Sequence, residues 1–77
     1  DTSIRFSLDG ETPVRLQILD IMGQVVRELV RPPLPGGHHR ARWDGRDDDG
    51  RWLASGLYLC RLQVGTRTVT RKMLLLR

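Results

Sequence analysis

Apolar and polar residues alternate along most of the chain, as they do in strands that bury one face. The runs IRFSL (residues 4–8) and VRLQIL (residues 14–19) both place an apolar side chain at every second position. The segment between them, DGETP, contains Asp-Gly and a proline, which are common turn residues. We therefore expect these two runs to be neighbouring strands.

The middle of the chain predicts two more strands, separated by a long loop. Gly23 interrupts the apolar pattern and can adopt a positive φ in a tight turn, so a third strand is expected over about Gln24–Val30. The prolines of RPPLPGG (residues 31–37) cannot donate ladder hydrogen bonds, and we expect this loop to cross between two sheets. A fourth strand follows in HHRARWD (residues 38–44). Its expected core face carries His39, Ala41 and Trp43.

The C-terminal part of the chain predicts a hairpin, LYLCRLQV (residues 57–64) followed by a Gly-Thr turn and RTVTRKMLLL (residues 67–76). The inward face of the first strand carries Tyr58, Cys60, Leu62 and Val64. The inward face of the second carries Val69, Met73 and Leu75. Because Leu74 and Leu76 make the opposite face apolar as well, we expect the end of this strand to be covered on both faces.

Helical periodicity is nearly absent, and the chain reads as about seven short strands with turn signals between them. This pattern predicts an all-β fold, specifically an immunoglobulin-like Greek-key β-sandwich of about seven strands. We expect a single domain over residues 1–77. A chain of this size cannot easily house a substrate cleft as well as a core, which argues against an enzyme.

The charge balance adds little to this picture. The chain has 13 Lys and Arg residues against 9 Asp and Glu, for a net charge of +4. The arginines are spread along the chain at positions that point outward from strands, which favours solvated faces and protected sheet edges over a nucleic-acid groove. No apolar stretch is long enough to span a bilayer. We therefore expect neither a nucleic-acid partner nor a transmembrane segment.

The residues that most often perform catalysis do not form a recognisable site. Cys60 is the sole cysteine, and alternation places it on the face of Tyr58 and Leu62, which favours a buried structural thiol over a nucleophile. His38 and His39 are adjacent, so in a strand they face opposite ways and make a poor metal site. No phosphate loop, CxxC pair or Ser–His–Asp set can be assembled. We expect no catalytic residue and no cofactor.

The segment DGRDDDG (residues 44–50) raises the question of a calcium site. Its carboxylates are Asp44, Asp47, Asp48 and Asp49, and the candidate metal ligands among them are Asp44, Asp47 and Asp49. Ca²⁺ takes about six to eight oxygen ligands, several of them from carboxylates in one compact loop. The EF-hand pattern fails, however, because its first and last ligand positions fall on Gly45 and Gly56.

A turn is the alternative interpretation of the same segment, and we favour it. Asp side chains bond to nearby backbone N–H groups, so Asp44 is expected to close the turn after Trp43. Gly50 supplies a positive φ at the end of the turn. Arg46 and Arg51 are expected to neutralise the carboxylates.

The two tryptophans raise the question of ligand binding. Trp43 alternates with arginines and is expected in the core, whereas Trp52 is the better candidate for exposure. For Trp52 we favour packing at the edge of the core, with stacking against a sugar left open. The predicted partner-binding residues are Trp52, Lys72 and Arg77.

Three segments together resemble a known family: VRLQILDIMGQVVREL, LPGGHHRARWDGRDDDGRWLASGLYLCRL and the terminal TRKMLLLR. They are similar to the immunoglobulin-like domain of the flagellar hook-capping protein, in the form that recurs at the C-termini of secreted bacterial proteins. The C-terminal sorting domains of type IX secretion share this shape. The resemblance covers Ile4–Arg77, and WDGRDDDGRWLASGLYLCRL is its most specific part. Cys60 departs from the family where an aromatic residue is common, and Trp52 where a small or Pro-like residue is common.

The resemblance implies a non-catalytic C-terminal module of a larger secreted bacterial protein, acting in export, cell-surface sorting or attachment. Its implied partners are secretion or surface-attachment machinery, or the upstream domain of the same chain. The implied location is secreted or on the extracellular side of the outer membrane. Two alternatives stay open: a flagellar hook-cap assembly domain, which requires self-association, and a carbohydrate-binding or adhesion module with Trp52 and Tyr58 as platforms.

Overall fold

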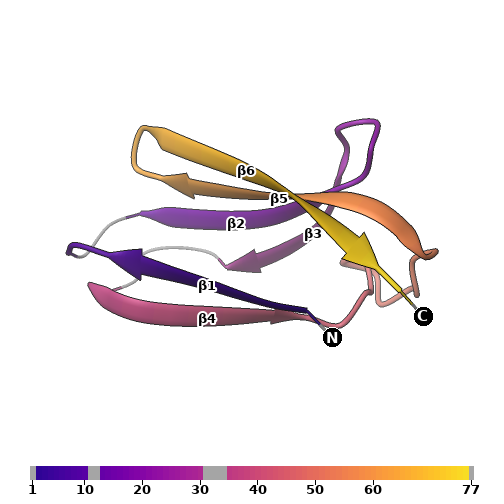
Figure 1. Cartoon of the computed structure of the whole chain (residues 1–77), viewed down its shortest axis with the longest axis horizontal. Helices are drawn as coiled ribbons and strands as arrows, with labels where there is room; N and C mark the ends of the chain where they lie inside the picture. Colours follow the sequence, from indigo (N-terminus) through magenta and orange to yellow (C-terminus); the bar gives the residue numbers. More distant parts are fainter. Residues whose placement is uncertain (1, 11–12, 31–34, 77) are drawn as a thin grey trace.

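The computed structural model describes residues 2–10, 13–30 and 35–76. These residues form two antiparallel sheets packed face to face, with no helix (Figure 1). The six strands are β1 (Thr2–Leu8), β2 (Val14–Leu19), β3 (Val25–Val30), β4 (Gly37–Trp43), β5 (Gly56–Val64) and β6 (Arg67–Leu75). The predicted β-sandwich is therefore confirmed, with six strands rather than about seven. The residues between β4 and β5 form turns, with one isolated bridge between Arg46 and Trp52.

Strand pairing follows the order β1-β4 in the smaller sheet and β3-β2-β5-β6 in the larger one. The prediction that β1 and β2 are neighbours is wrong, because they belong to different sheets. Each has an apolar face toward the core, and Phe6 and Leu16 join the same core from opposite sides. The predicted crossing between sheets after β3 is confirmed, since β3 and β4 lie in different sheets, although residues 31–34 of RPPLPGG lie outside the described residues.

The core lies between the sheets and is centred on Trp43, whose side chain is 1% exposed. The ring of Trp43 meets that of Tyr58 edge-on at 5.4 Å, a favourable geometry for two aromatic rings. Trp43 Nε1 donates to the carbonyl of Arg46, and the Tyr58 hydroxyl donates to the carbonyl of Ala54, so neither buried polar group lacks a partner. The buried members of the cluster are Leu16, Ile18, Ala41, Trp43, Tyr58, Cys60 and Leu75. The predicted inward face of β5 and the burial of Cys60 are thus confirmed.

The last strand departs from its predicted burial in two ways. Val69 was expected in the core but is 44% exposed, because a cavity between β6 and β1 leaves no side chain packed over it. Leu74 and Leu76 were expected to be covered, yet they are 61% and 76% exposed on the face that points away from the core. Alternation identified the two faces of β6 correctly, but it does not reveal which parts of a face another strand reaches.

Two glycines adopt the backbone conformation that their turns require. Gly23 has φ 84° and Gly50 has φ 82°, a region that residues with a Cβ rarely adopt, and both predicted turns are confirmed. No helix in the described part of the chain is long and apolar enough to cross a membrane.

Candidate functional site

The acidic loop that follows β4 is a compact hairpin of turns. The N–H of Asp47 donates to the carbonyl of Arg51, the N–H of Gly50 donates to the carbonyl of Asp47, and the N–H of Leu53 donates to the carbonyl of Gly45. These bonds are 2.9–3.0 Å long. They bring the two ends of DGRDDDG together.

Two of the candidate metal ligands accept backbone hydrogen bonds in this loop. Asp44 Oδ1 accepts the N–H of Arg46 at 3.1 Å, as predicted for a turn-closing aspartate. Asp47 Oδ1 accepts the N–H groups of Asp49 and Arg51 at 3.0 and 2.9 Å. Asp49 therefore contributes its backbone to the turn. Each of these two carboxylates stabilises the backbone conformation of the loop.

The loop also binds the free edge of β3 in the other sheet. The N–H of Asp48 donates to the carbonyl of Val26, and Asp48 Oδ1 accepts the N–H of Glu28. Arg27 of β3 reaches back with Nη1 3.1 Å from Asp44 Oδ1 and Nε 3.7 Å from Asp48 Oδ1. The acidic loop thus links the sheet of β4 to the sheet of β3 and covers an edge that would otherwise be open to pairing.

Arg27 is the residue that sequence reasoning missed. Arg46 and Arg51 were expected to neutralise the aspartates because they are close in sequence. The charge of Arg46 does act on Asp44, but the ion pairs among the described residues come from Arg27, seventeen positions before Asp44. The Arg46 side chain lies over the ring of Trp52 instead, 3.9 Å from its centroid. Arg27 lies between Val26 and Glu28 in a segment that does not alternate, and no local pattern distinguished it.

The charge of Asp44 responds to this environment. Partial burial acts to raise its pKa, but the hydrogen bond from the N–H of Arg46 and the charges of Arg27 and Arg46 outweigh that effect. The pKa of Asp44 therefore lies below its ordinary value of 3.8. Within residues 2–10, 13–30 and 35–76, no three His, Cys, Asp or Glu side chains are placed to hold one metal ion. The geometry supports the turn interpretation, and the calcium question stays a prediction to be tested.

The predicted partner-binding residues differ in where the structure places them. Trp52 is 58% exposed, so it does not pack at the core edge as favoured, and one face of its ring is covered by Arg46. Lys72 is exposed on the outer face of β6, directly opposite Leu59. Arg77 lies outside the described residues. Tyr58 is buried with its hydroxyl bonded to Ala54, so it is wrong as a sugar-stacking platform.

An apolar surface lies on the outer face of the four-stranded sheet, and we call it the outer apolar patch. Its exposed residues are Val25, Leu57 and Leu74, and the half-buried Leu59 and the buried Leu19 lie on the same face. The strand register puts Leu57 opposite Leu74, Leu59 opposite Leu19, and Leu19 opposite Val25, so the five side chains share one face. Leu57 and Leu74 are 44% and 61% exposed. Exposed apolar side chains that share one face of a sheet are typical of a surface that another protein covers.

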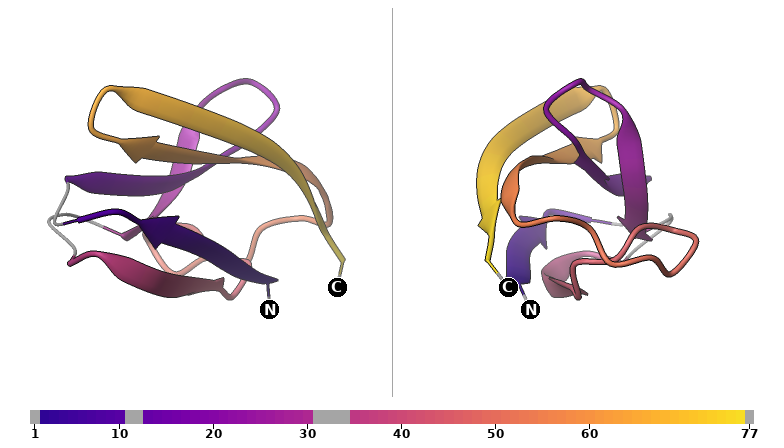
Figure 2. Two further views of the ribbon diagram at one scale, coloured as in Figure 1. Left: turned by 60° about the vertical axis from the view of Figure 1, so that its left-hand side comes forward. Right: turned by 90° about the vertical axis from the view of Figure 1, so that its right-hand side faces the viewer.

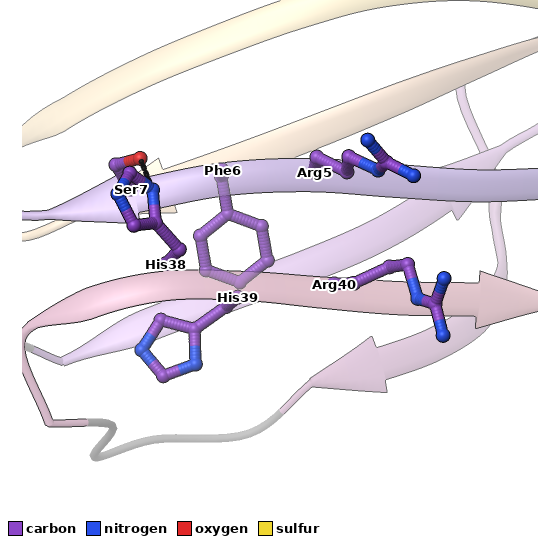
Figure 3. Close-up of a pocket in the computed structure, with 6 residues that line it drawn as sticks. All are labelled: Arg5, Phe6, Ser7, His38, His39 and Arg40. Atoms are coloured by element: carbon purple, nitrogen blue, oxygen red, sulfur yellow. Dashed lines mark hydrogen bonds between the residues drawn. The ribbon is translucent and has the colours of Figure 1, made fainter.

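A basic surface lies on the outer face of the two-stranded sheet. Arg5 is directly opposite Arg40, and Ser7 is directly opposite His38, with 2.8 Å between Ser7 Oγ and His38 Nδ1 (Figure 3). Phe6 points the other way and stacks on His39 at 5.4 Å. The ion pairs of the described residues leave Arg5 and Arg40 without a carboxylate. A shallow cavity of about 440 Å³ lies here, and its charged lining residues are basic. None of the ion pairs among the described residues joins a carboxylate to His38, so Ser7 and His38 are not completed to a Ser–His–Asp set.

Comparison with known protein families gives one match. The model described as the FlgD Ig-like domain matches residues 1–67. The matched region includes β1 to β5 and ends where β6 begins. No curated protein matches the chain.

Proposed function

Since the chain belongs to the family of FlgD Ig-like domains, we propose that it is a non-catalytic assembly module of the flagellar hook-cap type. In this role it packs against a second copy of itself through the outer apolar patch. The observation that carries the proposal is the pair Leu57 and Leu74, which lie directly opposite each other and are both exposed. Burying such a pair between two copies removes apolar area from water, which is the main driving force of association.

The chemistry of the surroundings supports this choice of surface. No Asp or Glu belongs to the patch, and its polar neighbour on β6 is Lys72, whose long side chain can lie at the rim of an interface. In the acidic loop, by contrast, the carboxylates of Asp44 and Asp47 accept hydrogen bonds from the loop's own backbone, and Asp44 also pairs with Arg27. It therefore stabilises the fold rather than presenting ligands. The basic surface on β1 and β4 carries like charges that would repel a second copy.

Export and surface attachment are the other role that the resemblance implies. They involve secretion machinery or the upstream domain as partner and a secreted or cell-surface location. The family match names the flagellar branch, and no feature of the described residues favours the sorting branch over it. Secretion therefore stays a prediction, to be tested with a fused reporter.

Sedimentation velocity tests the proposed self-association. The chain is compared at concentrations from about 10 μM to about 1 mM, a range that reveals dissociation constants typical of weak complexes. We expect a concentration-dependent dimer that Leu74→Glu weakens at least about tenfold, or about 1.4 kcal/mol. Thr68→Glu is the matched control, because it adds the same charge on the same face of β6 away from the patch. A chain that stays monomeric throughout, or equal effects of the two variants, would contradict the proposal.

A further inference from the structure

The side of the sandwich between β1 and β6 is open. β6 is the last strand of the four-stranded sheet, and β1 has a partner, β4, on one side only. The two strands border the same side of the molecule but do not pair (Figure 2). A cavity of about 380 Å³ lies between them. We call this space the β1–β6 cleft.

Among residues 2–10, 13–30 and 35–76, no strand occupies the cleft. Constant-type immunoglobulin sandwiches have about seven strands, divided into sheets of about four and three. Here the larger sheet is complete and the smaller one has two strands. The free edge of β1 faces the cleft, so a third strand added to the smaller sheet would occupy it. The alternate N–H and C=O groups along such an edge are available for pairing.

The floor of the cleft is apolar. Ile4 and Phe6 of β1, Cys60 and Leu62 of β5, and Val69 and Met73 of β6 line it. Val69 lies directly opposite Leu62 and on the inward face of its strand, yet it is largely exposed. An inward-facing side chain that nothing covers shows that the core is incomplete at this point. A strand with an apolar residue at alternate positions would cover it.

The charged groups around the cleft all have the same sign. Arg5, Arg71 and Lys72 belong to its lining, and none of its lining residues is Asp or Glu. Arg71 lies directly opposite Cys60 and belongs to the lining of the cleft. Its charge opposes the rise in the pKa of that thiol caused by burial. None of the ion pairs among the described residues involves Arg71. The cleft therefore complements an acidic group.

We propose that the β1–β6 cleft binds an extended segment of another polypeptide, one that alternates apolar and acidic residues. The segment pairs with the free edge of β1, places its apolar side chains over Ile4 and Val69, and brings a carboxylate on its outward side to Arg5 of β1. Strand addition of this kind gains affinity from backbone hydrogen bonds and specificity from side-chain pockets. Charge complementarity identifies the occupant and disfavours a second copy, because the outward positions of this chain's own strands carry mostly arginine, as at Arg15, Arg40 and Arg42. This site is independent of the self-association proposed above.

A synthetic seven-residue peptide of alternating Val and Glu, capped at both ends, tests the proposal on the chain. Hydrogen exchange measured by NMR should slow at least tenfold at β1 amides that do not bond to β4, and the labelling of Cys60 by a thiol reagent should slow by a similar factor. A Val–Lys peptide and a Val–Glu peptide with alternate N-methylated amides are the controls. Both should bind at least tenfold more weakly, the first from charge repulsion and the second from lost backbone pairing.

A charge reversal completes the test. Arg5→Glu should weaken the binding of the Val–Glu peptide and strengthen the binding of the Val–Lys peptide, while circular dichroism shows an unchanged fold. The proposal is overturned if millimolar Val–Glu peptide protects no β1 amide, if it protects the edge of β4 instead, or if the N-methylated peptide binds as well. It is also overturned if raising the concentration of the chain alone protects β1, since the occupant would then be a second copy.

Discussion

Asp44 illustrates how a potential metal ligand becomes part of a turn. Its Oδ1 accepts the N–H of Arg46 and lies 3.1 Å from Arg27 Nη1, so one oxygen serves both the local turn and the link to β3. The turn could be predicted from sequence because an aspartate bonds to an N–H two residues ahead. The partner Arg27 could not, since a pairing between different sheets depends on how the sheets pack.

The pKa of Asp44 predicts how stability depends on pH. Because the folded-state pKa lies below 3.8, the ionised carboxylate stabilises the fold above the unfolded-state pKa, and this contribution is lost as pH falls through the folded-state value. Asp44→Asn should lower the thermal midpoint at neutral pH and flatten its decline at pH values below 3.8. Asp49→Asn is the control, with little expected change. Identical pH profiles for Asp44→Asn and the unchanged chain would show that this carboxylate has no such role.

Calcium should have no effect on stability. Asp44 and Asp47 already bond to backbone N–H groups, and the loop lacks a bidentate closing carboxylate. A site occupied at about a hundred times its dissociation constant would add about 2.7 kcal/mol. We expect the same melting temperature in excess chelator and in millimolar Ca²⁺, with Mg²⁺ as the control ion. A rise of several degrees that is specific to Ca²⁺ would restore the metal interpretation.

Cys60 should react slowly with thiol reagents. It is 6% exposed, and burial raises its pKa despite the opposing charge of Arg71, so little reactive thiolate forms near neutral pH. Labelling by a maleimide should be at least about tenfold slower in the folded chain than in denaturant. The unfolded chain provides the internal reference. Equal rates in the two states would mean that the inward register of β5 is wrong.

At the scale of the elements, alternation predicted most strands and their inward faces. It succeeded for β5 because Tyr58 and Cys60 are buried in the core cluster and Leu62 packs partly against it. It failed at Val69 because a period of two identifies a face but not what covers that face. The prediction that β1 and β2 are neighbouring strands failed for a related reason. Turn residues indicate that the chain changes direction, but not whether the next strand pairs with the last or packs across the core from it.

Two adjacent leucines of β6 provide a test of these faces. Leu75 is 7% exposed in the core cluster, whereas Leu74 is 61% exposed on the other side of the strand. Leu75→Ala should destabilise the fold by about 2–5 kcal/mol, and Leu74→Ala by about 0.5 kcal/mol or less. The first value is a large part of the roughly 5 kcal/mol expected of a small domain. Urea unfolding measures both, and similar losses would contradict the assigned register.

At the scale of the whole molecule, the fold class could be predicted, but the surfaces could not. The sandwich follows from alternation and turn chemistry, which are local. The outer apolar patch combines residues from β2, β3, β5 and β6, and the β1–β6 cleft depends on which strand the smaller sheet lacks. Both arise from the order of strands in the sheets. Of the predicted contact residues, Trp52 and Lys72 are exposed, but the larger apolar surface was not recognised.

The central claim is that the domain assembles through the outer apolar patch, and the most direct test is NMR of the chain at increasing concentration. Methyl and amide signals of Leu57, Leu59 and Leu74 should shift together with one dissociation constant, while signals of Arg5 and Arg40 on the opposite sheet stay in place. Shifts confined to the β1–β4 face, or no shift up to about 1 mM, where even weak association is visible, would contradict the account.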